Sequence, residues 1–81
     1  MSRRFVFCTQ RQFDVVAELV RDGADNRTIA DRLVVVEDTV KSHMKVLLRK
    51  AGTKDRTALA VGIIRGHIAV VPPGSGAAHE F

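Results

Sequence analysis

The sequence has little of what several classes of protein require. Among its 81 residues there is one cysteine, and there is no tryptophan or tyrosine. A single cysteine cannot form an internal disulfide, so we expect a cytoplasmic protein in which Cys8 is a buried structural thiol. No apolar run approaches the roughly 20 residues that cross a bilayer. Polar residues follow the early FVFC stretch too soon for a signal peptide.

Groups of residues that carry out catalysis or bind metals are also missing from the sequence. The histidines at 43, 67 and 79 have neither metal-ligand spacing nor a cluster of carboxylates near them. No Ser-His-Asp set is visible either. We therefore expect no enzyme activity, no cofactor and no metal site.

The sequence is rich in signals for helix starts and helix ends. TQRQ at 9–12 is a capping box that predicts the first helix, and Asp22-Gly23 predicts its end. Asp25 is suited to cap a second helix of about two turns. The three valines at 34–36 are too few for a strand and lead directly into acidic residues. They therefore predict a tight apolar turn.

The rest of the chain predicts two further helices and a tail. The third helix is expected at about 37–51, and the fourth follows a cap at Thr53 or Asp55. The fold class is all-α: a compact four-helix domain without strands, in which helices 2 and 3 form a helix-turn-helix. We place a lead-in at 1–8, the domain at 9–71 and a disordered tail at 72–81.

The predicted third helix has one basic side and one apolar side. Lys41, Lys45 and Arg49 recur every four residues, which puts them on one ridge, and Ser42 lies beside it. The apolar side has no aromatic anchor of the kind that a membrane-surface helix needs. In a helix-turn-helix the second helix enters the major groove, where lysine can donate to guanine or pair with phosphate. The net charge of +4 also favours an anionic partner.

Five short motifs occur in register with those of one known family. They are CTQRQ at 8–12, GADNRTIA at 23–30, TVKSH at 39–43, KAG at 50–52 and RTALA at 56–60. Together they resemble the DNA-binding domain of LuxR/NarL-type (FixJ, GerE) bacterial transcription regulators. The resemblance implies a sequence-specific regulator that reads the major groove of double-stranded DNA with the helix at about 37–51.

The resemblance also implies roles for individual residues. It implies base contacts for Lys41, Ser42 and Lys45. We expect phosphate contacts from Asn26, Arg27, Thr28, Thr39, His43 and Arg49. The exposed start of the second helix favours phosphate for a physical reason of its own, since its amides are free. For His43 the alternative is a half-buried, hydrogen-bonded histidine, and for Arg49 it is simple solvation.

Several positions depart from the family pattern. Val36 replaces the usual Ser or Thr cap of the third helix, so Glu37 or Asp38 must compensate. These acidic residues should also repel DNA phosphates. Gln12 and Thr28 replace glutamates, which removes an opportunity for ion pairing between helices.

The fourth helix is expected to form a weak two-fold dimer, as is common in the family that the chain resembles. Its outward face contains Ala58, Val61, Gly62 and Arg65. Small residues let two helices approach closely, and a two-fold dimer would prefer an inverted repeat of DNA. The alternative is a monomer in which the small residues pack against the 68–71 stretch.

Two other functional hypotheses remain open. A sigma-factor region-4-like promoter-binding module also contains a helix-turn-helix. A protein-interaction module on the same scaffold would bind a polymerase subunit or another regulator, and Glu37 and Asp38 at the reading end of the helix favour it. RNA polymerase is a candidate partner of a DNA-binding regulator as well. With 81 residues, we expect either an excised C-terminal domain or a stand-alone regulator.

Overall fold

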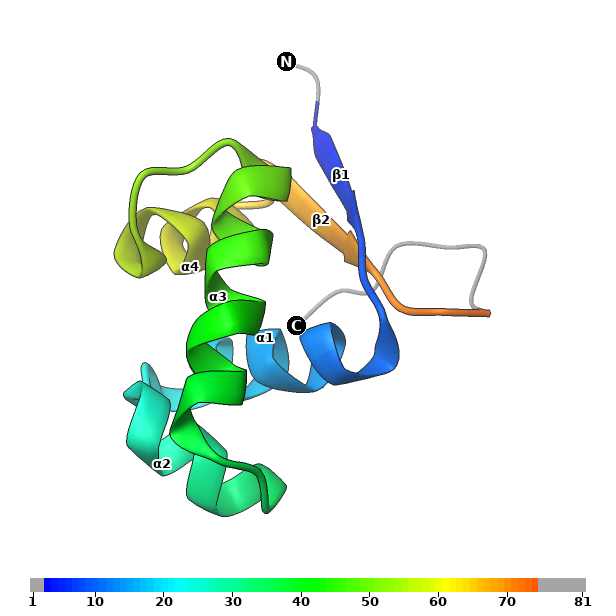
Figure 1. Cartoon of the computed structure of the whole chain (residues 1–81). Helices are drawn as coiled ribbons and strands as arrows, with labels where there is room; N and C mark the ends of the chain where they lie inside the picture. Colours follow the sequence, from blue (N-terminus) through cyan, green and yellow to red (C-terminus); the bar gives the residue numbers. More distant parts are fainter. Residues whose placement is uncertain (1–2, 75–81) are drawn as a thin grey trace.

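The computed structural model describes residues 3–74 of the chain. Along it lie β1 (Arg4–Phe7), α1 (Gln10–Asp22), α2 (Asn26–Leu33), α3 (Glu37–Ala51), α4 (Arg56–Ile64) and β2 (Ile68–Val71). In Figure 1, α2 lies at one end of α3, and α4 and the two strands lie at its other end. The small, four-helix fold class is confirmed. Most of the predicted tail, residues 75–81, lies outside the described residues.

The two strands correct the prediction of a domain without strands. β1 pairs with β2 in parallel, with Arg4 opposite Ile68 and Phe7 opposite Val71. Each strand has only four residues, and its partner lies at the other end of the described chain. Such a pairing leaves no local periodicity to detect, because the hydrogen bonds that define it join distant segments.

The predicted helix ends are confirmed by their capping geometry. Thr9 Oγ1 accepts from the Gln12 amide at 3.2 Å, and Gln12 Oε1 accepts from the Thr9 amide at 3.1 Å. Gly23 ends α1 in the left-handed region, at φ 68°. Of the two caps considered for α4, the structure uses Asp55, whose Oδ1 accepts from the Ala58 amide at 2.8 Å.

The core lies between the four helices and the inner face of the strands. Cys8 belongs to it, as expected for a structural thiol. Burial raises the pKa of the Cys8 thiol, although the charge of Lys50 acts in the opposite direction. The largest fully buried side chains are Ile29, Leu47, Leu59, Val6, Val15, Val16, Val40 and Val70.

Candidate nucleic-acid interface

A tight valine turn joins α2 to α3, as predicted. Val34 adopts φ 58°, which is unusual for a β-branched residue, and its side chain is 88% exposed. The Val35 amide donates to Ala30 O at 3.0 Å and closes α2. Val36 then occupies the N-cap position of α3 without any side-chain cap bond. The turn therefore holds α3 against α2 through backbone geometry, and strain is stored at Val34.

α3 exposes its basic ridge, which we define as Lys41, Lys45 and Arg49. All three side chains are exposed, and so is Ser42 beside them. Among residues 3–74 no carboxylate forms an ion pair with Lys45 or Arg49. The opposite side of the helix is buried through Val40, Met44, Leu47 and Ala51. The structure thus brings the predicted base contacts together on one exposed, positively charged surface.

Lys41 has a partner that the sequence-based prediction missed. Its Nζ lies 3.5 Å from Glu37 Oε2, and both side chains are well exposed. The signal was present in the sequence, since a glutamate four residues before a lysine forms a favourable pair on a helix. Glu37 also lies in the first turn, where its charge complements the helix dipole that Val36 leaves uncapped.

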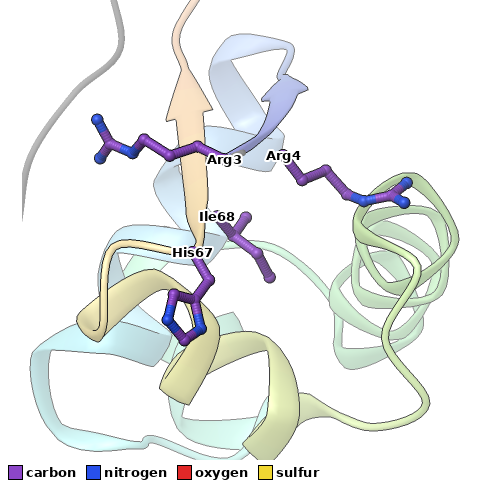
Figure 2. A pocket seen from close by; sticks show the side chains of 4 residues that line it. All are labelled: Arg3, Arg4, His67 and Ile68. Atoms are coloured by element: carbon purple, nitrogen blue, oxygen red, sulfur yellow. The ribbon is translucent and has the colours of Figure 1, made fainter. Parts of the chain in front are cut away.

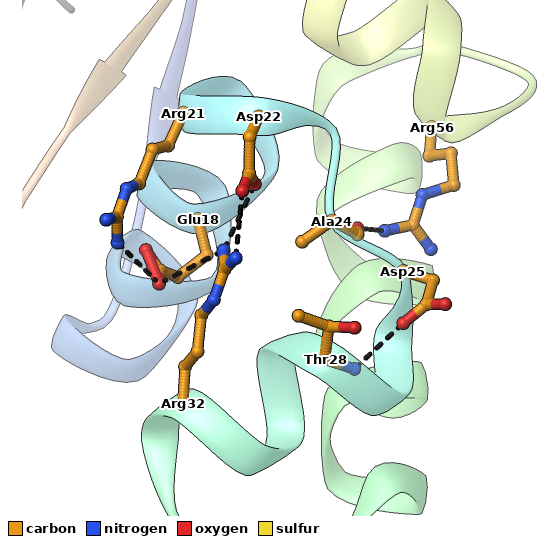
Figure 3. A network of polar contacts seen from close by, with 8 residues as sticks. All are labelled: Glu18, Arg21, Asp22, Ala24, Asp25, Thr28, Arg32 and Arg56. Atoms are coloured by element: carbon orange, nitrogen blue, oxygen red, sulfur yellow. Dashed lines mark hydrogen bonds and ion pairs between the residues drawn. The ribbon is translucent and has the colours of Figure 1, made fainter.

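The start of α2 has fewer free backbone amides than the start of a helix without an N-cap side chain. Asp25 Oδ1 accepts from the Thr28 amide at 2.8 Å (Figure 3). That hydrogen bond is the main cause that lowers the pKa of the Asp25 carboxyl. Because the Thr28 amide is occupied, the amides of Asn26 and Arg27 are the ones left to meet a phosphate.

Arg56 braces the start of α2 from α4. Its Nη1 donates to Asn26 Oδ1 at 2.6 Å, and its Nη2 donates to the carbonyl oxygen of Ala24. Figure 3 shows the Arg56 guanidinium reaching the segment just before α2. No sequence signal predicted this contact, since the partners lie 30 residues apart. The brace holds the Asn26 side chain, so its backbone amide is the group left for the predicted phosphate contact.

A second set of contacts joins the end of α1 to the end of α2. Arg32 binds Asp22 through two hydrogen bonds of 3.1 and 2.8 Å and lies 3.7 Å from Glu18. Glu18 also pairs with Arg21 at 3.6 Å (Figure 3). The hydrogen bond from Arg32 lowers the pKa of the Asp22 carboxyl. Arg32 therefore holds α1 and α2 together, whereas Arg21 pairs within α1.

The remaining predicted phosphate contacts lie on α3 and at the start of α2. Thr39 and His43 are half-buried, and Arg27 is exposed. Within residues 3–74 the His43 side chain has no hydrogen bond, so the structure offers no partner for the alternative structural role.

The contact between α1 and α3 survives the replacement of the family's glutamate by Gln12. Lys50 Nζ donates to Gln12 Oε1 at 3.0 Å and to the carbonyl oxygen of Phe7 at 2.8 Å. A hydrogen bond from a charged donor to a buried amide thus takes the place of an ion pair. The doubt that the sequence raised about this inter-helix contact is resolved in favour of the contact.

The four residues expected at a dimer interface on α4 lie in different surroundings. Val61 and Arg65 are exposed, and Ala58 is half-buried. A Cβ added at Gly62 would lie 2.5 Å from Ile68 Cδ1, so Gly62 packs on β2, as in the monomer alternative. Ile64, which was not singled out from sequence, is 67% exposed on the same helix. Dimerisation through α4 stays a prediction.

Two other classes of feature are not found in residues 3–74. Nowhere in residues 3–74 do three His, Cys, Asp or Glu side chains gather in a way that could hold a metal ion. No helix in this part of the chain has the length and apolar character that crossing a membrane demands.

Two short helices joined by a tight turn, the second with an exposed basic ridge, define a helix-turn-helix domain. The family model for bacterial regulatory proteins of the luxR family (GerE) matches residues 8–62. The chain belongs to this family, which is not the family of the sigma-factor alternative.

Similar curated proteins are transcriptional regulators by name. The chain is 37% identical to "Transcriptional regulatory protein LnrK" of Bacillus subtilis (strain 168) over 62 residues, which cover 76% of this chain and 28% of LnrK. It is 40% identical to "Nitrate/nitrite response regulator protein NarP" of Escherichia coli (strain K12) over 57 residues, 70% of this chain and 26% of NarP. The chain thus spans about a quarter of the length of these relatives. Family and relatives support DNA-binding transcription regulation, a non-enzymatic class of function.

Proposed function

We propose that this chain is a bacterial, sequence-specific regulator of transcription that binds double-stranded DNA. α3 enters the major groove, and Lys41, Ser42 and Lys45 meet the edges of the bases. The observation that carries the proposal is the exposed basic ridge on a helix whose opposite side is buried in the core. Lysine donors at this position can reach guanine O6 and N7.

Phosphate contacts on both sides of the groove fix the orientation of α3. On one side they come from the start of α2, through the amides of Asn26 and Arg27 and the Arg27 side chain. Thr28 contributes its hydroxyl, since Asp25 holds its amide. Along α3 itself, the contacts come from Thr39, His43 and Arg49. Such contacts set the position of the protein on the duplex and supply most of its salt-dependent affinity.

The protein acts in the cytoplasm as a weak homodimer formed through α4, and its preferred site is an inverted repeat. Exposed apolar side chains at Val61 and Ile64 support this face, with Ala58 and Arg65 beside them and Gly62 turned towards β2. RNA polymerase is a candidate partner of the DNA-bound form. Sedimentation at high concentration with DNA present tests the dimer, and a strictly monomeric protein would overturn it.

DNA binding is tested by fluorescence anisotropy on a random-sequence duplex across a salt series. The wild type is compared with the Lys41→Ala/Lys45→Ala double variant. Arg11→Ala/Arg21→Ala is the matched control, because it removes two charges from exposed side chains of α1. We expect affinity to fall steeply with salt, and the double variant at 41 and 45 to bind more weakly with a shallower slope than the control. Equal slopes in the two double variants would refute a DNA-facing ridge.

Base contact is tested at the selected site. Once site selection has given an operator, Lys41→Ala should weaken binding there by about 1–3 kcal/mol. The same variant should lose less affinity for random DNA than for the operator. Equal losses on both DNAs would make Lys41 a phosphate contact.

The second candidate function is a protein-interaction module on the same scaffold. The ion pair between Glu37 and Lys41 favours it, because a base-facing lysine is already partly neutralised. This candidate predicts no DNA binding even at low salt. It also predicts a polymerase subunit or another regulator that stays bound after nuclease treatment.

A further inference from the structure

A second group of basic side chains lies at the start of the two strands. Arg3, Arg4, His67 and Ile68 line a pocket there (Figure 2). The side chains of Arg3, just before β1, and Arg4, its first residue, point in opposite directions. Arg3 Nε donates to the carbonyl oxygen of Gly66 at 3.0 Å, whereas Arg4 reaches towards the end of α3.

The Arg4 guanidinium lies over the C-terminal cap of α3. A Cβ added at Gly52 would lie 3.3 Å from Arg4 Cζ and 3.4 Å from one of its terminal nitrogens. A cation in this place complements the negative end of the helix dipole. Within residues 3–74 no carboxylate pairs with Arg4, and its side chain is exposed, so its charge is available to a partner.

Arg4 extends the basic ridge of α3 beyond the end of the helix. Gly52 follows Arg49 by three residues, and Arg49 follows Lys45 by four, so these positions lie along one side of α3. From Lys41 to its last residue, Ala51, α3 rises about 15 Å, at 1.5 Å per residue. The major groove is only about 12 Å wide. An α3 that crosses the groove with Lys41 and Lys45 at the bases would therefore bring its last turn to the flanking phosphate backbone.

We propose that Arg4 binds a DNA phosphate beside the groove that α3 reads. The partner is recognised by its charge, and the pairing of β1 with β2 holds Arg4 in place through the bond from the Arg4 amide to the His67 carbonyl oxygen, at 2.9 Å. Arg3 lines the same pocket and adds positive charge there. This inference rests on the proposed DNA-binding function and adds an N-terminal strand to its contact surface.

The test compares three variants of the full chain with the wild type on a random-sequence duplex of about 20 base pairs, two helical turns. Arg4→Gln removes the charge, Arg4→Lys keeps it, and Arg21→Gln removes an equal charge from the end of α1, where it pairs with Glu18. Anisotropy across a salt series gives the slope of affinity against salt for each protein. Thermal unfolding, followed by circular dichroism, shows that every variant is folded at the assay temperature.

We expect Arg4→Gln to make the salt slope shallower by about 0.9, the share of one phosphate contact. Arg4→Lys should restore the wild-type slope, and Arg21→Gln should leave it unchanged. If Arg4→Gln behaves like Arg21→Gln while Lys41→Ala/Lys45→Ala still flattens the slope, the contact by Arg4 is refuted and the proposed function stands. If the wild type binds no DNA at low salt, the proposed function itself fails, and the inference fails with it.

Discussion

Glu37 is the acidic residue whose removal should have opposite effects on DNA binding and on folding. It pairs with Lys41 at 3.5 Å and occupies the first turn of α3. Glu37→Gln removes a negative charge next to the proposed DNA surface and frees the lysine. It also removes a charge that complements the start of the helix, where Val36 supplies no cap.

The expected gain in binding is about fivefold. A carboxylate at about 8 Å from a phosphate in water repels it by about 0.5 kcal/mol. An exposed ion pair between helix residues four apart stabilises the free protein by about 0.3–0.5 kcal/mol. In the variant, Lys41 has no such pair to break before it contacts DNA. Together these come to about 1 kcal/mol, or roughly fivefold in the dissociation constant.

The expected loss of folding stability is of similar size. The lost ion pair and the lost dipole interaction together lower the free energy of unfolding by about 1 kcal/mol. In a domain of this length that lowers the melting temperature by roughly 4–8 °C. Circular dichroism measures the melting temperature, and anisotropy at fixed salt measures binding.

Glu18→Gln is the matched control for Glu37→Gln. It makes the same chemical change on α1, where Glu18 pairs with Arg21 and Arg32. It should lower stability without tightening binding. Glu37→Gln binding that is no tighter than that of Glu18→Gln would refute the placement of Glu37 beside DNA.

Three further predictions concern residues that hold α2 and α3 in place beneath the proposed DNA interface. Val34→Asn should raise the free energy of unfolding by about 1 kcal/mol in a urea titration, since Asn tolerates φ 58° better and the exposed valine loses little packing. Arg56→Lys should lower it by about 1–2 kcal/mol, because lysine cannot make both bonds to Asn26 and the preceding loop, but should leave the salt slope of DNA binding unchanged. The cap at Asp25 predicts acid sensitivity: its pKa is lowered in the folded state, so its stabilisation is complete above the ordinary value of about 4 and is lost as pH falls through the lowered pKa. Asp25→Asn should flatten the decline of melting temperature with falling pH, and a decline as steep as that of the wild type would contradict this assignment.

Features governed by neighbouring residues could be predicted from sequence. The capping box at Thr9, the turn at Val34 and the ridge of α3 depend on contacts within about four positions. The chain supplies the residue types that each of them needs, so the helices and the exposed basic side followed directly. The pair of Glu37 and Lys41 belongs to this local class, and its spacing was sufficient to predict it.

Features that join distant segments could not be predicted in the same way. Nothing near Arg4 in the sequence indicates that it pairs beside Ile68 or lies over Gly52. Nothing near Arg56 indicates that it reaches Asn26. In both cases an arginine that looks like an ordinary surface charge is placed by packing of the chain as a whole. Composition therefore says how many cations the chain has, whereas the fold decides which of them are free for a polyanion.

Two departures from the family pattern show different ways in which such a domain keeps its geometry. At Gln12 the contact with α3 is preserved because a neutral oxygen accepts the hydrogen bond from Lys50. At Val36 the cap bond is lost, and the acidic first turn of α3 compensates through its charge. The first replacement leaves the proposed DNA surface untouched, whereas the second leaves the start of α3 dependent on acidic residues beside that surface. Glu37 therefore has two opposite effects in this chain. Its charge stabilises the start of α3, and the same charge weakens the proposed attraction to DNA.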